Sequence, residues 1–297
     1  MKVFVAGATG VIGRRAVPAL VAGGHEVTGV ARTPEKAALL QGLGATPVTV
    51  DLFDPAAVRS AAAGHDAVCN LATHIPPLTK AALPRAWAEN DRIRTEASAN
   101  LAAAVEGGRF VQESITFPYR DGGDDWLDED TPYEAPGFTQ SVETAEAAAH
   151  AVDGVVLRFG MFYAPDAAHT LDIVRLARKR VAALIGKPEA YASQIHAEDA
   201  GSAVVAALTA PPGTYNVVED EPMRREDIFA VLAEVLGTKP PRKVPTTVAK
   251  LGGAKSTMLM RSQRVSNRRF KDATGWSPRY PSQREGLPAV VRDMADA

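Results

Sequence analysis

Short apolar runs alternate with longer amphipathic stretches through the first half of the chain. Six runs rich in Val, Leu and Phe have the length of buried strands, and they are Lys2–Ala6, Glu26–Ala31, Thr46–Val50, Asp66–Ala72, Arg109–Ser114 and Val155–Phe159. The stretches between them have the pattern of helices over Val11–Ala22, Pro34–Leu40, Pro55–Ala62, Leu83–Val105 and Thr139–Val152. Alternation of this kind predicts βαβ units with right-handed crossovers. We therefore expect an α/β fold with a parallel sheet.

The regular alternation of apolar runs and amphipathic stretches ends at about residue 166. A helix is predicted over Leu171–Leu184, a strand over Tyr215–Val218 and a helix over Arg225–Leu236, and a proline-rich tail follows. We expect residues 1–165 to form the sheet domain and residues 166–297 to form a smaller substrate-binding lobe, with residues 191–220 returning to the sheet domain.

The charge balance narrows the class of partner. The chain has 33 Lys+Arg against 35 Asp+Glu, a net charge of −2, so no global basic field exists to bind a nucleic acid or an anionic membrane. No apolar run approaches the ~20 residues of a membrane span. The single cysteine, Cys69, excludes an internal disulfide framework, and no spacing of His, Asp or Glu suggests a metal site. We expect a cytoplasmic protein that acts on a small molecule.

The strongest motif follows the first predicted strand and reads Gly7-Ala8-Thr9-Gly10-Val11-Ile12-Gly13. A phosphate group needs a tight turn, a backbone without Cβ crowding and the N–H groups of a helix N-terminus. Gly7 and Gly10 supply the turn and the close approach, and Gly13 lets the helix pack on the sheet. The spacing differs from Gly-x-Gly-x-x-Gly. The strand–turn–helix context nevertheless predicts a dinucleotide site that includes Thr9, Val11 and Ile12.

This loop resembles that of the extended short-chain dehydrogenase/reductase family, the NAD-dependent epimerase/dehydratase group. Further segments similar to that family follow in the family's order, and they are Asp51-Leu52, Asn70-Leu71-Ala72-Thr73, Asn90, the segments 157–165 and 195–199, and Thr274-Gly275-Trp276-Ser277-Pro278. The resemblance implies a Rossmann-type doubly wound parallel sheet with a smaller C-terminal substrate lobe.

The resemblance also implies the position of the cofactor. Asp51 and Leu52 correspond to the family's adenine contacts, and Leu71, Ala72 and Thr73 correspond to residues that line the nicotinamide side. Asn90, on the long following helix, completes the predicted cofactor-binding set.

The end of the second strand indicates which dinucleotide is bound. An NAD site usually has Asp or Glu ~20 residues past the loop, bonded to the ribose 2′-OH. Here the chain reads Val30-Ala31-Arg32-Thr33. Arg32 is able to bind a 2′-phosphate with its forked guanidinium, and Lys36 follows nearby. This favours NADP over NAD, the alternative being a solvated arginine.

The catalytic pattern departs from that of the family. Redox members use a Ser and a Tyr-x-x-x-Lys pair, in which the lysine lowers the pKa of the tyrosine that transfers a proton. Here Phe138 occupies the tyrosine position and Val142 the lysine position, and neither exchanges a proton. The usual serine position is Ile115, between Ser114 and Thr116.

A replacement for the missing pair is therefore sought near the end of the fifth strand. We predict Tyr119 as the proton donor, assisted by Ser114 or Thr116, because open α/β sheets bind ligands at this edge. Glu113 is a second candidate if it is buried, and a capping or solvated carboxylate if it is not. His74 is either near the nicotinamide or a plain loop residue.

Several residues have plainer interpretations. We expect His196 to satisfy local backbone groups, and Tyr163 and Tyr191 to pack within the lobe. The acidic run Asp121–Asp130 is either a solvated loop or a lid. The basic cluster is either solvated or binds an anionic substrate, and it comprises Arg261, Arg264, Arg268, Arg269 and Lys271.

These observations predict an NADP-dependent oxidoreductase or epimerase/dehydratase-like enzyme on a small carbonyl or hydroxyl compound, monomeric or homodimeric. Two alternatives stay open. One is a non-redox isomerase, cyclase or lyase on the same fold, and the other is a dinucleotide-sensing regulatory protein.

Overall fold

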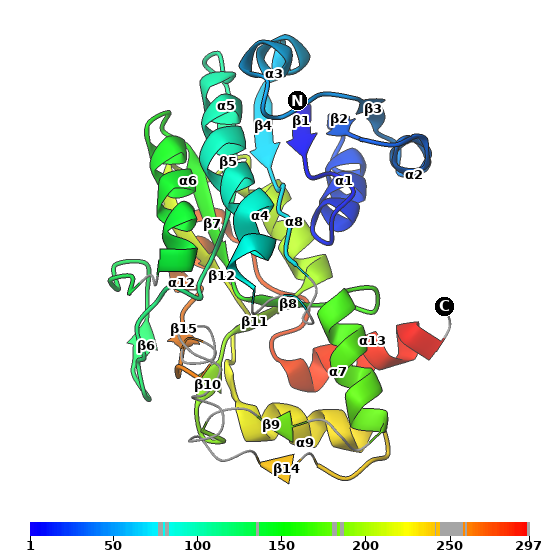
Figure 1. Cartoon of the computed structure of the whole chain (residues 1–297), viewed down its shortest axis with the longest axis vertical. Helices are drawn as coiled ribbons and strands as arrows, with labels where there is room; N and C mark the ends of the chain where they lie inside the picture. Colours follow the sequence, from blue (N-terminus) through cyan, green and yellow to red (C-terminus); the bar gives the residue numbers. More distant parts are fainter. Residues whose placement is uncertain are drawn as a thin grey trace.

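The structure is a computed structural model in which a sheet domain stands above a smaller C-terminal group of helices and short strands (Figure 1). It describes residues 1–76, 80, 83–134, 137–179, 183–184, 187–240, 242–243, 258 and 260–295.

A seven-stranded parallel sheet forms the centre of the fold, in the order β12-β7-β5-β4-β1-β2-β3. Its strands are β1 (Lys2–Ala6), β2 (Glu26–Val30), β3 (Thr46–Val48), β4 (Ala67–Asn70), β5 (Arg109–Ile115), β7 (Val155–Phe159) and β12 (Gly213–Val217). The chain leaves β1 in one direction for β2 and β3 and resumes on the other side with β4, so the order reverses between β1 and β4. This confirms the predicted Rossmann-type sheet, which binds ligands beyond the carboxyl strand ends at such a reversal.

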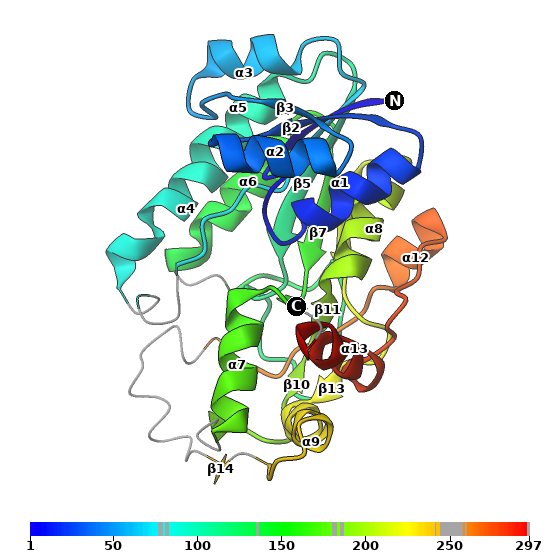
Figure 2. The same cartoon turned by 90° about the vertical axis from the view of Figure 1, so that its right-hand side faces the viewer.

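Helices cover both faces of the sheet because successive strand residues point to opposite sides. Val3 and Val5 belong to the core shared with α1 (Gly13–Ala22), α2 (Pro34–Gly42) and α8 (Ala197–Ala207). Phe4 and Ala6 belong to the second core, under α3 (Pro55–Ala62), α5 (Ser98–Ala103) and α6 (Gln140–His150). Figure 2 shows α1 and α8 beside one another, in agreement with their extensive contacts.

The helix predicted over Leu83–Val105 consists of four successive segments. It begins with the 3₁₀ turn η1 (Pro84–Trp87), continues as α4 (Ala88–Arg92), widens into the π-helical turn η2 (Ile93–Ala97) and ends as α5. The change of pitch at η2 alters which side chains face the sheet after Arg92.

The C-terminal part is built on α7 (Ala168–Arg178), α9 (Arg225–Val235) and α13 (Gln283–Ala295), which share a third apolar core. Strands β8 (Met161–Tyr163) and β11 (Gln194–His196) form a parallel pair. The remaining short elements are β6 (Trp126–Leu127), β9 (Ala183–Leu184), β10 (Tyr191–Ala192), β13 (Met223–Arg224), β14 (Arg242–Lys243), β15 (Arg264–Val265), η3 (Gly137–Thr139) and α12 (Arg268–Thr274).

One sequence prediction in this half needs correction, and one segment was missed. The helix predicted over Leu171–Leu184 ends at Arg178, and Ala183–Leu184 is a strand. The segment that contains β11 and α8 was not predicted at all. β12 pairs with β7 in the main sheet, so the chain returns to the sheet after α7. Division into two domains stays a prediction.

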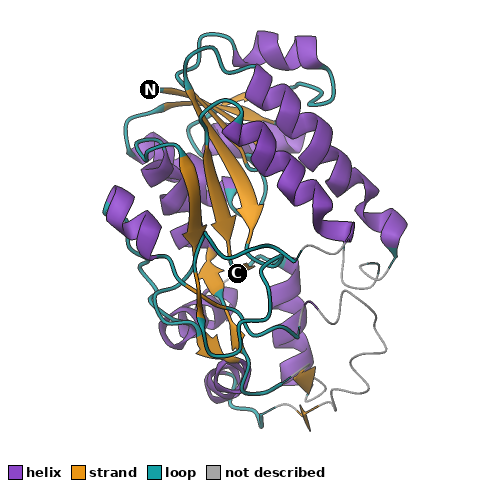
Figure 3. Ribbon diagram, turned by 90° about the vertical axis from the view of Figure 1, so that its left-hand side faces the viewer, coloured by secondary structure: helices purple, strands orange, loops and turns teal. Residues whose placement is uncertain are grey.

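Figure 3 shows the carboxyl ends of the sheet strands pointing toward the C-terminal part. Within the residues described above, none of the helices has the length and apolar character needed to span a bilayer.

Candidate functional site

The glycine loop is a turn in which Gly7 and Gly13 are required by the fold. Gly7 has a φ of +76°, and a Cβ there would lie 2.4 Å from the Leu71 carbonyl carbon. A Cβ at Gly13 would lie 2.3 Å from the Gly7 carbonyl oxygen. Gly10 is exposed, and its Cβ would meet only that same oxygen, at 3.2 Å. A side chain at Gly10 therefore requires only a small shift of that oxygen, and it would cover the outer surface of the loop.

The loop ends at the N-terminus of α1, where the N–H groups of Val11, Ile12 and Gly13 have no protein acceptor within the described ranges. Free N–H groups and the positive end of the helix dipole attract an anion. A turn free of side chains at the helix N-terminus fits the pyrophosphate of a dinucleotide.

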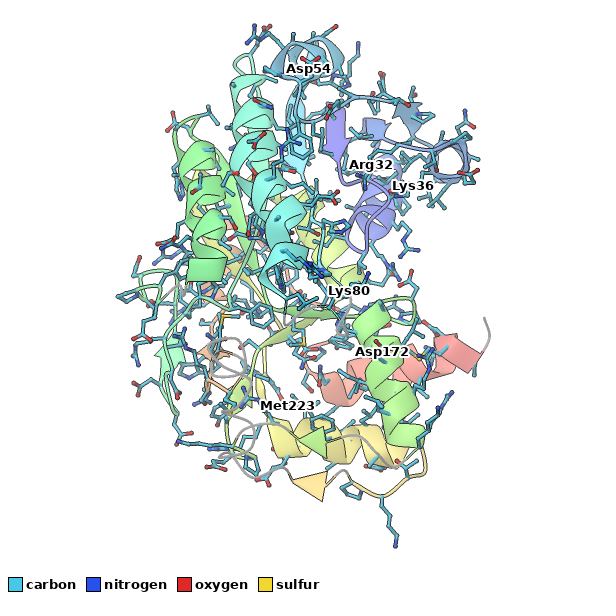
Figure 4. The ribbon with its side chains drawn as sticks, in the orientation of Figure 1. Arg32, Lys36, Asp54, Lys80, Asp172 and Met223 are labelled. Atoms are coloured by element: carbon cyan, nitrogen blue, oxygen red, sulfur yellow. The ribbon has the colours of Figure 1, made fainter. Side chains whose placement is uncertain are left out.

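Arg32 directly follows β2 and is 65% exposed. Its Nη1 lies 3.7 Å from Oε1 of Glu89 on α4, and Oε2 of Glu89 lies 3.7 Å from Nε2 of His74. Thr33 caps α2 by accepting a hydrogen bond from the Lys36 N–H. Arg32 and Lys36 thus stand at the start of α2 (Figure 4), where a 2′-phosphate would meet two cations.

The segment after β3 is held by one hydrogen bond within it and by one from α5. The Asp51 carboxylate accepts from the Phe53 N–H at 3.0 Å, and the Leu52 carbonyl accepts from Asn100 Nδ2 at 3.0 Å. Asp51 is exposed, which leaves its second oxygen facing solvent. Adenine contacts by Asp51 and Leu52 stay predictions.

The segment after β4 remains beside β1, because the Leu71 N–H donates to the Ala6 carbonyl at 3.0 Å. Leu71 and Ala72 are buried, and Thr73 is exposed. Asn90 is buried as well, and its Oδ1 accepts from the His74 N–H at 2.9 Å. Asn90 therefore positions the loop after β4, and direct cofactor contact by any of these residues stays a prediction.

Tyr119, predicted as the proton donor, lies in the interior of the protein. The side chain is fully buried, and the hydroxyl donates to Asn216 Oδ1 at 2.9 Å and accepts from Arg158 Nη1 at 2.8 Å. Burial raises the pKa of Tyr119 to about 12, although Arg158 acts in the opposite direction. These contacts join the segment after β5 to β7 and β12. A role of Tyr119 in proton transfer stays a prediction.

Ser114 and Thr116 are buried too. The Ser114 hydroxyl donates to Glu146 at 2.5 Å, and the Thr116 N–H donates to the Phe159 carbonyl at 3.0 Å. Assistance by either hydroxyl in catalysis stays a prediction.

Glu146 on α6 and Arg158 on β7 form an ion pair of 2.7 Å that the sequence analysis missed. Glu146 also accepts from the Tyr133 hydroxyl at 2.9 Å. The available signal was Arg158 itself, because a charge inside an otherwise apolar strand needs a buried partner.

The positions that correspond to the family's Tyr and Lys lie at the start of α6. Phe138 belongs to the turn η3, and Val142 lies in α6 with 1% of its side chain exposed. Neither residue type carries a transferable proton.

Glu113 is buried and paired. Both of its carboxylate oxygens accept from Nη2 of Arg94, each at 3.2 Å, and Arg94 is also buried. Burial raises the pKa of Glu113, although Arg94 acts in the opposite direction. Arg94 was another residue that sequence reasoning missed, because a helical arginine is usually solvated.

His196, Tyr163 and Tyr191 follow their plainer interpretations. His196 caps α8 by accepting from the Glu198 N–H at 3.2 Å, and burial lowers its pKa to about 4. The Tyr163 hydroxyl donates to the buried Glu219. The Arg224 guanidinium lies 4.6 Å from the ring centre of Tyr191.

The acidic run and the basic cluster contact each other, which neither sequence interpretation included. Strand β6, within the acidic run, pairs with β15. Arg264 lies over the Trp126 ring at 4.1 Å, and Arg269 binds Asp130 at 2.5 Å. Lys271 binds Asp220 at 2.8 Å. These cations already have partners, which weighs against a dedicated site for an anionic substrate.

Comparison with known proteins agrees with this geometry. Residues 7–211 match the model of a family described as NAD(P)H-binding. A 3-diazoavenalumate denitrifying reductase of a Streptomyces species is 34% identical, over 97% of this chain and 99% of that protein. A 2-alkyl-3-oxoalkanoate reductase of Shewanella oneidensis is 28% identical, over 84% of this chain and 70% of that protein.

Among solved structures, the human epimerase family protein SDR39U1 (isoform 2) with NADPH superimposes with a TM-score of 0.79. It is 25% identical in sequence, and the match covers 99% of this chain and 100% of that chain.

Proposed function

Because this chain belongs to the NAD(P)H-binding family, within the extended short-chain dehydrogenase/reductase group, we propose that it is an NADPH-dependent reductase. We propose further that it reduces a small electrophile without the usual tyrosine as proton donor. One combination of observations carries this proposal. The glycine loop presents an outer surface free of side chains at Gly10, and the sequence register predicts Phe138 and Val142 at the positions of the family's proton-transferring pair.

The choice of NADPH rests on Arg32. A guanidinium forms paired hydrogen bonds with a phosphate, whereas the acidic residue that would bind a free ribose 2′-OH is missing after β2. Lys36 adds a second positive charge at the start of α2. The human relative with NADPH supports the same choice.

In this proposal the residues of the chain bind the cofactor, and none of them takes part in its chemistry. The loop from Gly7 to Gly13 would bind the pyrophosphate, and Arg32 would bind the 2′-phosphate. When bound, the nicotinamide supplies a hydride. Buried Tyr119 keeps its hydroxyl bonded to Asn216 and Arg158, so it supports the protein around the reaction site.

The proposed substrate class starts from the residue types Phe138 and Val142, neither of which is able to supply a proton. Reduction of a ketone needs a hydride and then a proton for the alkoxide. A carbon that bears a diazonium group needs the hydride alone, because the new C–H bond forms while the C–N bonding pair leaves with N₂. No proton from the protein is required. The Streptomyces relative is named for a denitrifying reduction of a diazo compound, which supports this class.

The experiment is to follow NADPH oxidation with matched aryl diazonium salts and aryl ketones, against a blank without protein. We expect turnover of the diazonium compounds and little of the ketones. Ketone turnover without diazonium turnover would reject the substrate class. NADPH binding without oxidation of any compound would favour a regulatory protein, and conversion of a substrate without NADPH oxidation would favour a non-redox enzyme.

A further inference from the structure

Arg94 has hydrogen-bonding capacity that the protein does not use. Its side chain is 2% exposed, and Nη2 alone reaches Glu113. The Nε and Nη1 atoms are buried and have no acceptor among the described residues. Buried polar groups almost always have partners, so unpaired donors of this kind indicate that something is bound there.

The backbone around Arg94 is also unusual. Arg94 lies in the π-helical turn η2, between the α-helical segments α4 and α5. Single π-turns inside α-helices are rare and occur frequently at functional sites. Here the turn accompanies an arginine that leaves the helix surface to contact a strand end.

The order of the sheet strands places Arg94 relative to the cofactor. The glycine loop follows β1, and Arg32 follows β2 on one side of it. β4 and β5 lie on the other side of β1. A dinucleotide with its pyrophosphate on the loop and its 2′-phosphate at Arg32 must extend its nicotinamide riboside half across the ends of β4 and β5.

Glu113 stands at this end of the sheet. Gln112 on β5 pairs with Asn70, the last residue of β4, so Glu113 lies one position beyond that pair. Since Glu113 holds Nη2 of Arg94, the guanidinium is at the same edge. The guanidinium is therefore near the strand ends across which the nicotinamide riboside would lie.

The local charge indicates the kind of acceptor. Glu113 already neutralises Arg94, and Glu146 and Arg158 neutralise each other nearby. An anionic ligand group would add a buried negative charge without a counterion. Uncharged oxygens accept N–H bonds without that cost, and the nicotinamide riboside carries hydroxyl and carboxamide oxygens.

We propose that Arg94 is a cofactor-binding residue, and that its Nε and Nη1 donate to an uncharged oxygen of the nicotinamide riboside half. This inference rests on the proposed NADPH-dependent function. Glu113 is its positioning residue, because the carboxylate orients the guanidinium and balances its charge.

The test compares two ligands that share the adenosine half. NADPH contains the nicotinamide riboside, whereas adenosine 2′,5′-bisphosphate does not. Arg94→Lys keeps the positive charge beside Glu113 but removes the guanidinium donors. It should bind NADPH about 10- to 100-fold more weakly and adenosine 2′,5′-bisphosphate within about twofold of wild type. Calorimetric titration gives both dissociation constants, and the fluorescence of bound NADPH gives a second readout.

Two further variants separate the loss of the Arg94 hydrogen-bond donors from the loss of the Arg94–Glu113 charge balance. Arg94→Met with Glu113→Gln removes the ion pair as a whole, so no charge is left buried alone. It should lose NADPH affinity as Arg94→Lys does. Glu113→Gln alone keeps the guanidinium donors but removes the carboxylate that orients them, so it should weaken NADPH binding less than Arg94→Lys does and leave adenosine 2′,5′-bisphosphate binding within about twofold of wild type.

The outcomes are distinct. Wild-type NADPH affinity in Arg94→Lys would overturn the proposal. Equal losses for both ligands would also overturn it, because they would indicate a change of the whole fold. If wild type binds NADPH, failure of these variants to respond leaves the proposed function standing. If wild type binds no NADPH, the proposed function itself fails.

Discussion

The Arg32 guanidinium faces the Glu89 carboxylate at 3.7 Å. Arg32 lies directly after the sheet strand β2, whereas Glu89 lies on the helix α4. Both side chains are largely solvated, so the pair contributes about 0–1 kcal/mol and is readily exchanged for a phosphate. Glu89 thus binds Arg32 only weakly, and a 2′-phosphate would compete with the Glu89 carboxylate for the guanidinium.

Arg32→Ala should lower NADPH affinity by about 10- to 150-fold, because one charge-assisted contact is lost, and should leave NADH affinity within about threefold. Glu89→Gln should strengthen NADPH binding up to about fivefold by freeing the guanidinium. Titration of NADPH and NADH against wild type, Arg32→Ala and Glu89→Gln measures these affinities. Equal wild-type affinities for NADPH and NADH would contradict the assignment.

The glycine loop offers a matched pair of substitutions. Gly10→Val should keep the far-UV circular dichroism of wild type and lose at least about 100-fold in NADPH affinity, since the new side chain covers the pyrophosphate surface. Gly13→Val should instead unfold or strongly destabilise the protein, because its Cβ would lie 2.3 Å from the Gly7 carbonyl oxygen. Undiminished NADPH binding by Gly10→Val would mean that the loop is only a turn.

Tyr119→Phe separates the two roles considered for this residue. We expect a loss of about 1–3 kcal/mol in unfolding free energy, because Asn216 and Arg158 lose a buried partner, and turnover within about threefold. Tyr215→Phe is the control, since the Tyr215 hydroxyl donates to a backbone carbonyl, that of Pro211. A drop in turnover of about 100-fold or more would restore Tyr119 as the proton donor. Urea unfolding and NADPH oxidation are the two measurements.

The contribution of Glu219 to stability should fall as the pH rises from about 4.5 to about 8. Burial, together with the carboxylates of Asp199 and Glu285, raises the pKa of Glu219 from 4.5 to about 8, against the effect of Tyr163. The folded state therefore holds a proton that the unfolded state releases in this range, so folding loses roughly 2–4 kcal/mol as the pH rises.

Glu219→Gln is the test of this pH dependence. The variant lacks the titrating carboxyl, so its unfolding free energy should vary less between pH 5 and pH 8 than that of wild type. Urea unfolding over that range measures it, and identical slopes for the two proteins would contradict the assignment to Glu219.

The central sheet was predictable because its strands are buried on both faces and read as continuous apolar runs. β1 and β7 match their predicted bounds, and β2 and β3 end slightly earlier than predicted. Ala31 and Val50 are still buried there, so an apolar side chain marks burial rather than strand pairing.

The second half was harder for physical reasons. β8 and β11 have three residues each, which is too short for a periodic pattern. α8 is rich in Ala and lacks a clear polar stripe. It packs closely on α1 because Gly201 has no Cβ, which would otherwise lie 2.5 Å from the Arg15 Cβ.

The part of the site that is formed by backbone was predictable from the sequence. The hydrogen-bond partners of its buried side chains were not. The glycine loop has its expected strand–turn–helix position. The orientation of Tyr119 depends on Asn216 and Arg158, which are 97 and 39 positions away. Arg94 reaches Glu113 across 19 positions. No local pattern contains such pairings.

We propose that hydride from the nicotinamide reaches the substrate carbon without a proton from the protein. The most direct measurement supplies NADPH deuterated at C4 on one face at a time, with an aryl diazonium salt in ordinary water, and locates deuterium in the product by NMR. We expect one of the two cofactors to place deuterium on the carbon that carried nitrogen, with one N₂ released per NADPH oxidised. Gly10→Val should react no faster than the blank without protein. Product carbon that carries only hydrogen from water with either cofactor, or equal rates for wild type and Gly10→Val, would contradict the account.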